Sequence, residues 1–190
     1  ISSTLTSISD AKYSASFTPD GEGLKTIVIN ANTLQDKVGH GNLASNTFEW
    51  TYDSIAPTIM ITADEGVSGF TSKDATLSLT FTLSEPVEEG TFTTGVITIS
   101  GGSISLTRIS DTEYTGNFSP SGTGLKTIVI NANMLQDKAG NGNLASNTFE
   151  WTYIVRKITA SEGESGFTSD DDTLHLTFKV DPMPIVYRLY

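Results

Sequence analysis

Apolar residues alternate with serine and threonine along much of the chain, and this period of two predicts β-strands. The strongest run places Leu77, Leu79, Phe81 and Leu83 on one face and polar residues on the other. Successive side chains of a strand point to opposite faces, so each run predicts a half-buried strand. Between residues 58 and 153 the pattern predicts about seven short strands, at 58–63, 77–83, 96–100, 104–109, 114–118, 125–131 and 148–153, with a loop at 64–74.

One stretch of the chain occurs twice. Residues 24–52 and 125–153 differ only at the pairs Thr33/Met134, Val38/Ala139 and His40/Asn141. Near-copies about 100 residues apart are typical of an array of one domain type.

The two ends of the chain match different parts of this repeat. Residues 1–53 align with its C-terminal half, and residues 154–190 restart it, because Ile158, Leu176 and Phe178 echo Ile61, Leu79 and Phe81. We therefore predict a complete repeat at 54–153, flanked by a C-terminal half-repeat at 1–53 and the first strands of a further repeat at 154–190. Pro57 restricts φ, which suits a stiff linker between domains.

The strand count and the composition predict a fold class. About seven short strands in fewer than 100 residues, in a chain with frequent glycine, serine and threonine, favour an all-β protein made of tandem immunoglobulin-like antiparallel β-sandwiches.

Charge and composition exclude several kinds of partner. The net charge of -11 disfavours nucleic acid, and acidic loops could hold calcium or simply be solvated. The chain has no cysteine, so disulfides and thiolate chemistry are excluded. No apolar run is long enough to span a membrane. A start at Ile1 suggests a processed product or a piece of a longer protein.

Three motifs together resemble the bacterial Ig-like repeats of large surface adhesins and biofilm-associated proteins. They are the linker at 53–59 (DSIAPTI), the segment 81–87 (FTLSEPV) and the segment 137–143 (DKAGNGN). The resemblance covers nearly the whole chain except about the last ten residues. It implies β-sandwiches in linear arrays, an extracellular or cell-surface location, calcium at some domain junctions, and no enzymatic activity.

The linker and two loops supply a candidate calcium site. In a sandwich of this topology the loops after the second and sixth strands lie where the chain enters. Asp53 could therefore meet Asp137 and Glu85, or Glu88 or Glu89 in place of Glu85. Asn141 could add an amide oxygen as a further calcium ligand. The alternative for residues 137–142 is a simple turn, because asparagine and glycine tolerate positive φ. The second junction has Ile154 in place of Asp53, so it favours such a site less than the first junction does.

No pattern predicts catalysis. His40 and His175 lie near no nucleophile motif, and the acidic run at 170–172 reads as a solvated turn, so we expect no enzyme. Asn117 begins a glycosylation sequon that matters only if the host modifies secreted proteins. Trp50 and Trp151 are predicted in sandwich cores rather than as sugar platforms.

The incomplete ends suggest self-association. A half-sandwich leaves an apolar face in water and strand edges unpaired. The C-terminal strands of one subunit, with Ile185, Tyr187 and Leu189 on a third strand, could complete the N-terminal half of the next, giving a head-to-tail filament. The alternative is that the chain is a window from a longer array, with neighbouring repeats as partners.

These observations predict an extracellular structural protein that acts as a stalk, spacer or filament in adhesion or biofilm. The alternative is a ligand- or carbohydrate-binding module of a secreted protein. That alternative predicts divergent loops, whereas residues 35–46 and 136–147 are nearly the same in both copies.

Overall fold

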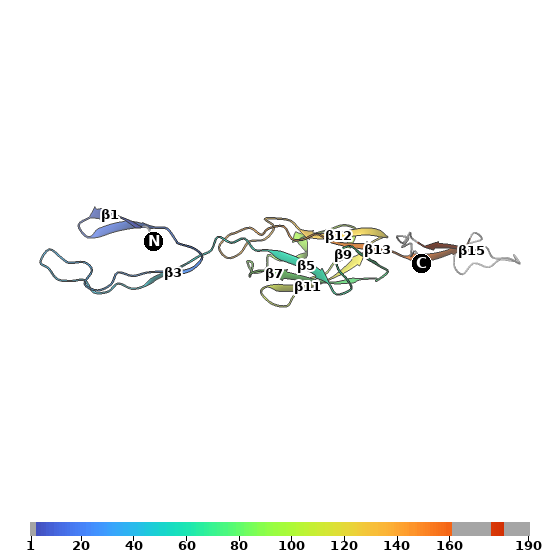
Figure 1. Cartoon of the computed structure of the whole chain (residues 1–190), viewed down its shortest axis with the longest axis horizontal. Coiled ribbons are helices and arrows are strands. Elements are labelled where there is room, and N and C mark those ends of the chain that lie inside the picture. The colour runs from blue at the N-terminus through green and yellow to red at the C-terminus, as the bar shows by residue number, and fades with distance from the viewer. Residues whose placement is uncertain (1–2, 161–175, 181–190) are drawn as a thin grey trace, which may run out of the picture. The chain divides into compact units, whose positions relative to one another are not determined.

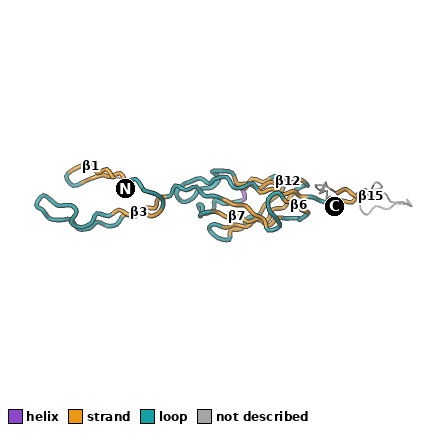
Figure 2. The backbone as a smooth tube through the Cα atoms, in the orientation of Figure 1, coloured by secondary structure: helices purple, strands orange, loops and turns teal. Residues whose placement is uncertain are grey.

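Strands and loops make up nearly all of the structure, a computed structural model that describes residues 3–160 and 176–180. The helical content of these residues is one short 3-10 turn, η1 (Thr94–Val96) (Figure 2). No helix in the described ranges is long and apolar enough to cross a membrane. The chain divides into two compact units, Ile1–Ile55 and Ala56–Tyr190 (Figure 1).

The second unit contains a sandwich of two sheets. Its nine strands are β5 (Ile59–Ala63), β6 (Phe70–Ser72), β7 (Leu77–Leu83), β8 (Ile97–Ile99), β9 (Gly102–Ile104), β10 (Thr107–Arg108), β11 (Glu113–Pro120), β12 (Gly124–Ile130) and β13 (Phe149–Tyr153). One sheet has the order β10-β11-β7-β5, with β9 also against β11, and the other has the order β6-β13-β12-β8. Every pair is antiparallel except β6 with β13. Figure 1 shows β5, β7 and β11 side by side.

The apolar strand faces meet between these two sheets. Phe81 and Phe118 from one sheet and Trp151 from the other have no exposed surface. The Trp151 ring meets Phe118 edge-on, with ring centroids 6.2 Å apart. Burying a large apolar side chain contributes about 1.5–3 kcal/mol, so the alternating residues named from the sequence hold the sheets together. The predicted antiparallel immunoglobulin-like sandwich is confirmed.

Two details of the strand prediction were wrong. The predicted loop 64–74 contains β6, because Phe70 stacks on Trp151 with ring centroids 6.3 Å apart and aligns this segment with β13. A strand of three residues is too short to show an alternating pattern. The predicted strand 104–109 is split into β9 and β10, which both pair with β11. The split falls at Ser105, between β9 and β10. The Ser105 carbonyl oxygen lies so close to Gly116 of β11 that a Cβ added at Gly116 would stand 2.6 Å from it.

The first unit reproduces half of this sandwich. Its strands are β1 (Ser3–Ser9), β2 (Lys12–Phe17), β3 (Gly23–Ile27) and β4 (Phe48–Tyr52). The β3–β4 register, with Ile27 opposite Phe48, repeats the β12–β13 register, with Ile128 opposite Phe149. Phe17 meets Trp50 edge-on at 5.9 Å, as Phe118 meets Trp151. Within residues 3–55, no strand takes the places that β5, β6, β7 and β8 hold in the second unit.

The missing strand pair has a counterpart near the other end of the chain. β14 (Arg156–Ala160) pairs antiparallel with β15 (Leu176–Val180). In this pair Ile158 lies opposite Phe178, and in the sandwich Ile61 lies opposite Phe81. The β14–β15 pair therefore repeats the β5–β7 pair in both sequence and register. The predicted third strand, 185–190, lies outside the described residues.

Candidate functional site

The loop between β12 and β13 contains a tight turn built around Asp137. Asp137 Oδ1 accepts hydrogen bonds from the backbone N–H groups of Ala139 at 2.8 Å and Asn141 at 2.9 Å. Asp137 Oδ2 accepts a third from Asn141 Nδ2 at 2.9 Å. Gly140 has φ 93°, a conformation that glycine adopts readily. The turn predicted for residues 137–142 is present, and it holds the Asp137 side chain in one position.

Buried Asn143 fixes the rest of this loop. Its Oδ1 accepts the backbone N–H groups of Met134 at 2.9 Å and Leu135 at 2.8 Å. Its Nδ2 donates to the carbonyl oxygens of Asn131 at 3.0 Å and Leu144 at 2.7 Å. A buried amide with four satisfied bonds is costly to disturb. The loop therefore presents Asp137 from a rigid support.

Two further carboxylates approach Asp137 from other segments. Glu85 follows β7, close to where Val87 forms an isolated bridge with Asp137. Asp53 lies in the linker, where its Oδ1 accepts the N–H of Ile55 at 3.1 Å. The carboxylate oxygens of Asp53, Glu85 and Asp137 lie within 4.8 Å of one another. Of the residues predicted for calcium, these three share one cluster and Asn141 is hydrogen-bonded to it.

The alternative acidic ligands lie outside this cluster. Glu88 and Glu89 are exposed, and the backbone N–H of Glu88 donates to the Gln136 carbonyl oxygen at 2.8 Å. Among the described residues, the Asp53, Glu85 and Asp137 group is the one set of three or more acidic or histidine side chains close enough to share an ion.

The chemistry of the cluster suits a hard cation. Burial raises the pKa of Asp137, but hydrogen bonds from Asn141, Ala139 and Gly140 outweigh it, so the pKa lies below its ordinary value of 3.8. Asp137 is therefore charged at neutral pH although it is only 4% exposed. Oxygens bound to one calcium ion at about 2.3–2.6 Å lie at most about 5 Å apart, which the spacing of this cluster satisfies. Calcium binding stays a prediction.

The other predicted sites are not brought into this cluster. Asn117 lies on β11 and is exposed, and its glycosylation stays a prediction. The proposed assembly residues Ile185, Tyr187 and Leu189 lie outside the described residues. His175 and the acidic run at 170–172 also lie outside them.

The first unit carries an exposed apolar surface, which we call the open face. Its residues are Tyr13, Ile27, Ile29, Leu34, Phe48 and Trp50. Phe48 is 60% exposed, whereas its counterpart Phe149 is 2% exposed, and the other members show the same contrast. The core prediction holds for Trp151 but is wrong for Trp50, which is 37% exposed because nothing in residues 3–55 covers it.

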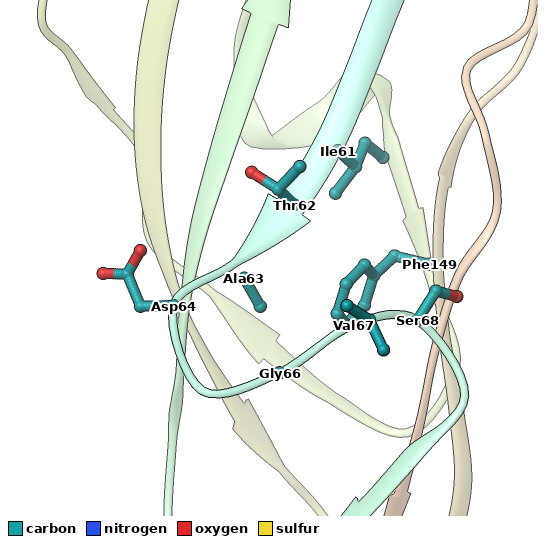
Figure 3. Close-up of a pocket in the computed structure, with 8 residues that line it drawn as sticks. All are labelled: Ile61, Thr62, Ala63, Asp64, Gly66, Val67, Ser68 and Phe149. Atoms are coloured by element: carbon teal, nitrogen blue, oxygen red, sulfur yellow. The ribbon is translucent and has the colours of Figure 1, made fainter.

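A separate pocket of about 420 Å³ lies in the second unit, between β5 and the loop that leads to β6. Apolar and small residues line most of it, including Ile61, Val67 and Phe149 (Figure 3). Asp64 is its one charged residue, and Figure 3 shows that side chain directed away from Val67 and Phe149. A specific ligand site needs several converging polar groups, and the one charged side chain of this lining does not converge on its apolar residues.

Comparison with known proteins matches the region whose fold and site are described above. The bacterial Ig-like domain family matches residues 53–153, which is more than half of the 190 residues. The match begins at the cluster residue Asp53 and ends with β13. No curated protein matches the chain.

Proposed function

Because the chain belongs to the bacterial Ig-like domain family, we propose that it is a structural module of an extracellular stalk or filament that serves adhesion or biofilm formation. Domains of this family occur in surface or extracellular proteins and are typically non-enzymatic. In the proposed role the module spaces or links its neighbours, which are further Ig-like repeats or other copies of the chain joined head to tail.

The path of the chain through the sandwich carries this proposal. At the incoming end, the Leu144 N–H donates to the Pro57 carbonyl oxygen at 2.9 Å. At the outgoing end, the Ile154 N–H donates to the Ser72 carbonyl oxygen at 3.0 Å. β13 runs between these ends, since it starts opposite Ile128 and finishes opposite Gly124. A domain whose chain enters at one end and leaves at the other transmits tension along its length, as a spacer must.

Two experiments test the structural role. Pulling the full chain from its two ends should give one cooperative unfolding event for the sandwich, releasing roughly 30–35 nm of chain. Protease treatment of intact producing cells should remove the protein while cytoplasmic markers survive. Protection of the protein in intact cells would overturn the extracellular assignment. Gradual extension without a distinct event would overturn the mechanical one.

We further propose that calcium binds Asp53, Glu85 and Asp137 and stiffens the linker. The support is the grouping of three carboxylates from the linker and two loops of the domain, one of them held rigidly by the turn. The Asn141 amide can add a fourth ligand if its oxygen turns toward the ion. Because an ion bound to the folded state stabilises it by mass action, calcium should raise the melting temperature of the sandwich.

Calorimetry of the full chain with calcium or with a chelator tests this site. Asp53→Asn and Glu85→Gln should each remove most of the calcium-dependent shift in melting temperature. Asp36→Asn is the matched control, since Asp36 occupies the same turn in the first unit but belongs to no carboxylate group among the described residues. An unchanged melting temperature of the unmodified chain, or an equal loss in the control, would contradict the site.

A further inference from the structure

We propose that the β14–β15 pair of a second copy of this chain covers the open face, with β15 adding to the edge of β2 that no strand within residues 3–160 or 176–180 occupies. The inference rests on the proposed structural function and names the partner and the strand register of its self-association.

The open face has a known complement, because the same sequence is covered elsewhere in the molecule. In the second unit, β5 and β7 supply Ile61, Leu79 and Phe81, each at most 1% exposed, to the core that contains Phe149 and Trp151. Phe48 and Trp50 stand on β4 as Phe149 and Trp151 stand on β13, in the same register. A β5–β7-like strand pair is therefore the shape and chemistry that the open face fits.

The chain carries that strand pair. Ala160 lies opposite Leu176 in β14–β15, as Ala63 lies opposite Leu79 in β5–β7. Leu176 is 46% exposed, whereas Leu79 is 1% exposed. The strand pair thus also has an apolar residue in water where its counterpart is buried. Each surface lacks what the other provides, which is the arrangement of strand complementation.

The register of the proposed contact follows from the sandwich. β11 pairs with β7 so that Thr115 lies opposite Thr80 and Tyr114 opposite Phe81. Along its other edge β11 pairs with β9 and β10, and β2 already has β1 in that position. Transferring the β11–β7 register places Thr177 of the second copy opposite Ser14, and Phe178 opposite Tyr13.

An asparagine of the first unit adds a second point of recognition. In the sandwich, Asn147 Oδ1 accepts the Ile61 N–H at 2.7 Å, and Asn147 Nδ2 donates to the Ile61 carbonyl oxygen at 2.9 Å. Asn46 is the counterpart of Asn147, and within the described residues its side chain makes no hydrogen bond. In the proposed contact it meets the backbone of Ile158, the counterpart of Ile61.

The same register brings two lysines together. Glu113 lies opposite Thr82 in the sandwich, and the corresponding residues of the contact are Lys12 and Lys179. Like charges directly opposite in a sheet disfavour pairing. The lysine pair makes the register testable by charge reversal.

Cysteine pairing between two differently tagged chains tests the register, since the natural chain has no cysteine. The Ser14→Cys chain mixed with the Thr177→Cys chain should form a disulfide-linked heterodimer, because directly opposite Cα atoms lie about 4.5–5.5 Å apart. Ser16→Cys mixed with Thr177→Cys is the control, because two residues along a strand add about 7 Å. Equal yields from both mixtures would overturn the register, and no heterodimer would overturn the contact.

Sedimentation of the full chain over a concentration series provides an independent measure. Association should strengthen about two- to fivefold in Lys12→Glu and weaken about tenfold in Asn46→Ala. Calorimetry should show the sandwich of the second unit unchanged in both. A chain that stays monomeric at every concentration would overturn the contact. This holds even if the β2 amides of that monomer resist hydrogen exchange, because the strands that protect them would then belong to the same chain. That result leaves the spacer function standing, because the pulling experiment tests it separately.

Discussion

Residues 24–52 and 125–153 are nearly the same sequence in two different surroundings. Their strands pair in the same register, and the Phe17–Trp50 contact matches the Phe118–Trp151 contact. Their burial differs, since Trp151 has no exposed surface and Trp50 is 37% exposed. The comparison separates what a segment does by itself from what a core requires. A strand pair needs only its own residues, whereas burial needs covering strands such as β5 and β7 of the second unit.

The turns of the two copies show how far local chemistry reaches. Asp36 Oδ1 accepts the N–H groups of Val38 and His40 at 2.9 Å each, as Asp137 Oδ1 accepts those of Ala139 and Asn141. Asp36 remains exposed and Asp137 is buried. The turn therefore forms in both units, and the core of the second unit changes only how deeply the aspartate is buried.

The largest expected effect comes from removing the matched tryptophans. Trp151→Ala should cost about 3–5 kcal/mol of unfolding free energy, because it leaves a cavity in a packed core. Trp50→Ala in a dilute chain should cost far less, because that ring is already partly in water. Calorimetric unfolding of the full chain measures both. Equal losses would mean that the open face is covered in solution even in the monomer.

An intermediate effect is expected from the matched aspartates. Asp137→Asn should cost about 1–3 kcal/mol at neutral pH, because it weakens charge-assisted bonds in a buried turn. The pKa of Asp137 is lowered, so its stabilisation is present above 3.8 and is lost as pH falls through the lower folded value. The variant should therefore lose stability less steeply in acid than the unmodified chain.

Asp36→Asn serves as the control for that measurement. The N–H of His40 is the main group that lowers the pKa of Asp36, so the sign of its pH dependence is the same. The Asp36 side chain is exposed, and the Asp36→Asn substitution should leave the unfolding free energy of the second unit unchanged at every pH. An acid profile of Asp137→Asn that parallels the unmodified chain would contradict the role given to this carboxylate.

The smallest effect is expected from exchanging the copies at one position. Asn141→His places in the second unit the residue that the first unit already has, where His40 Nδ1 lies 3.1 Å from Asp36 Oδ2. The unfolding free energy without calcium should change by less than about 0.5 kcal/mol. The calcium-dependent shift in melting temperature should shrink, because an amide oxygen is lost. A large loss without calcium would show that the turn depends on its surroundings.

Much of the fold could be predicted from the alternating pattern. Leu77, Leu79 and Phe81 identify β7 because period-two alternation is a property of the strand itself. β6 escaped prediction because its three residues are held by Phe70 on Trp151, about 80 positions away in the sequence. The candidate cluster was named from the order of strands and loops. Only the structure could show that Glu85 joins it and that Glu88 and Glu89 do not.

The sequence by itself determined the longer strands, their hairpin-like registers and the asparagine and aspartate turns, since these depend on contacts within short segments. The tertiary structure decided which copy of the repeat is buried. It also decided which carboxylates meet, because both outcomes require segments distant in the chain to come together. Burial is a property of a pair of surfaces, so identical residues lie in a core or in water according to whether the strands that β5 to β8 provide in the second unit are present.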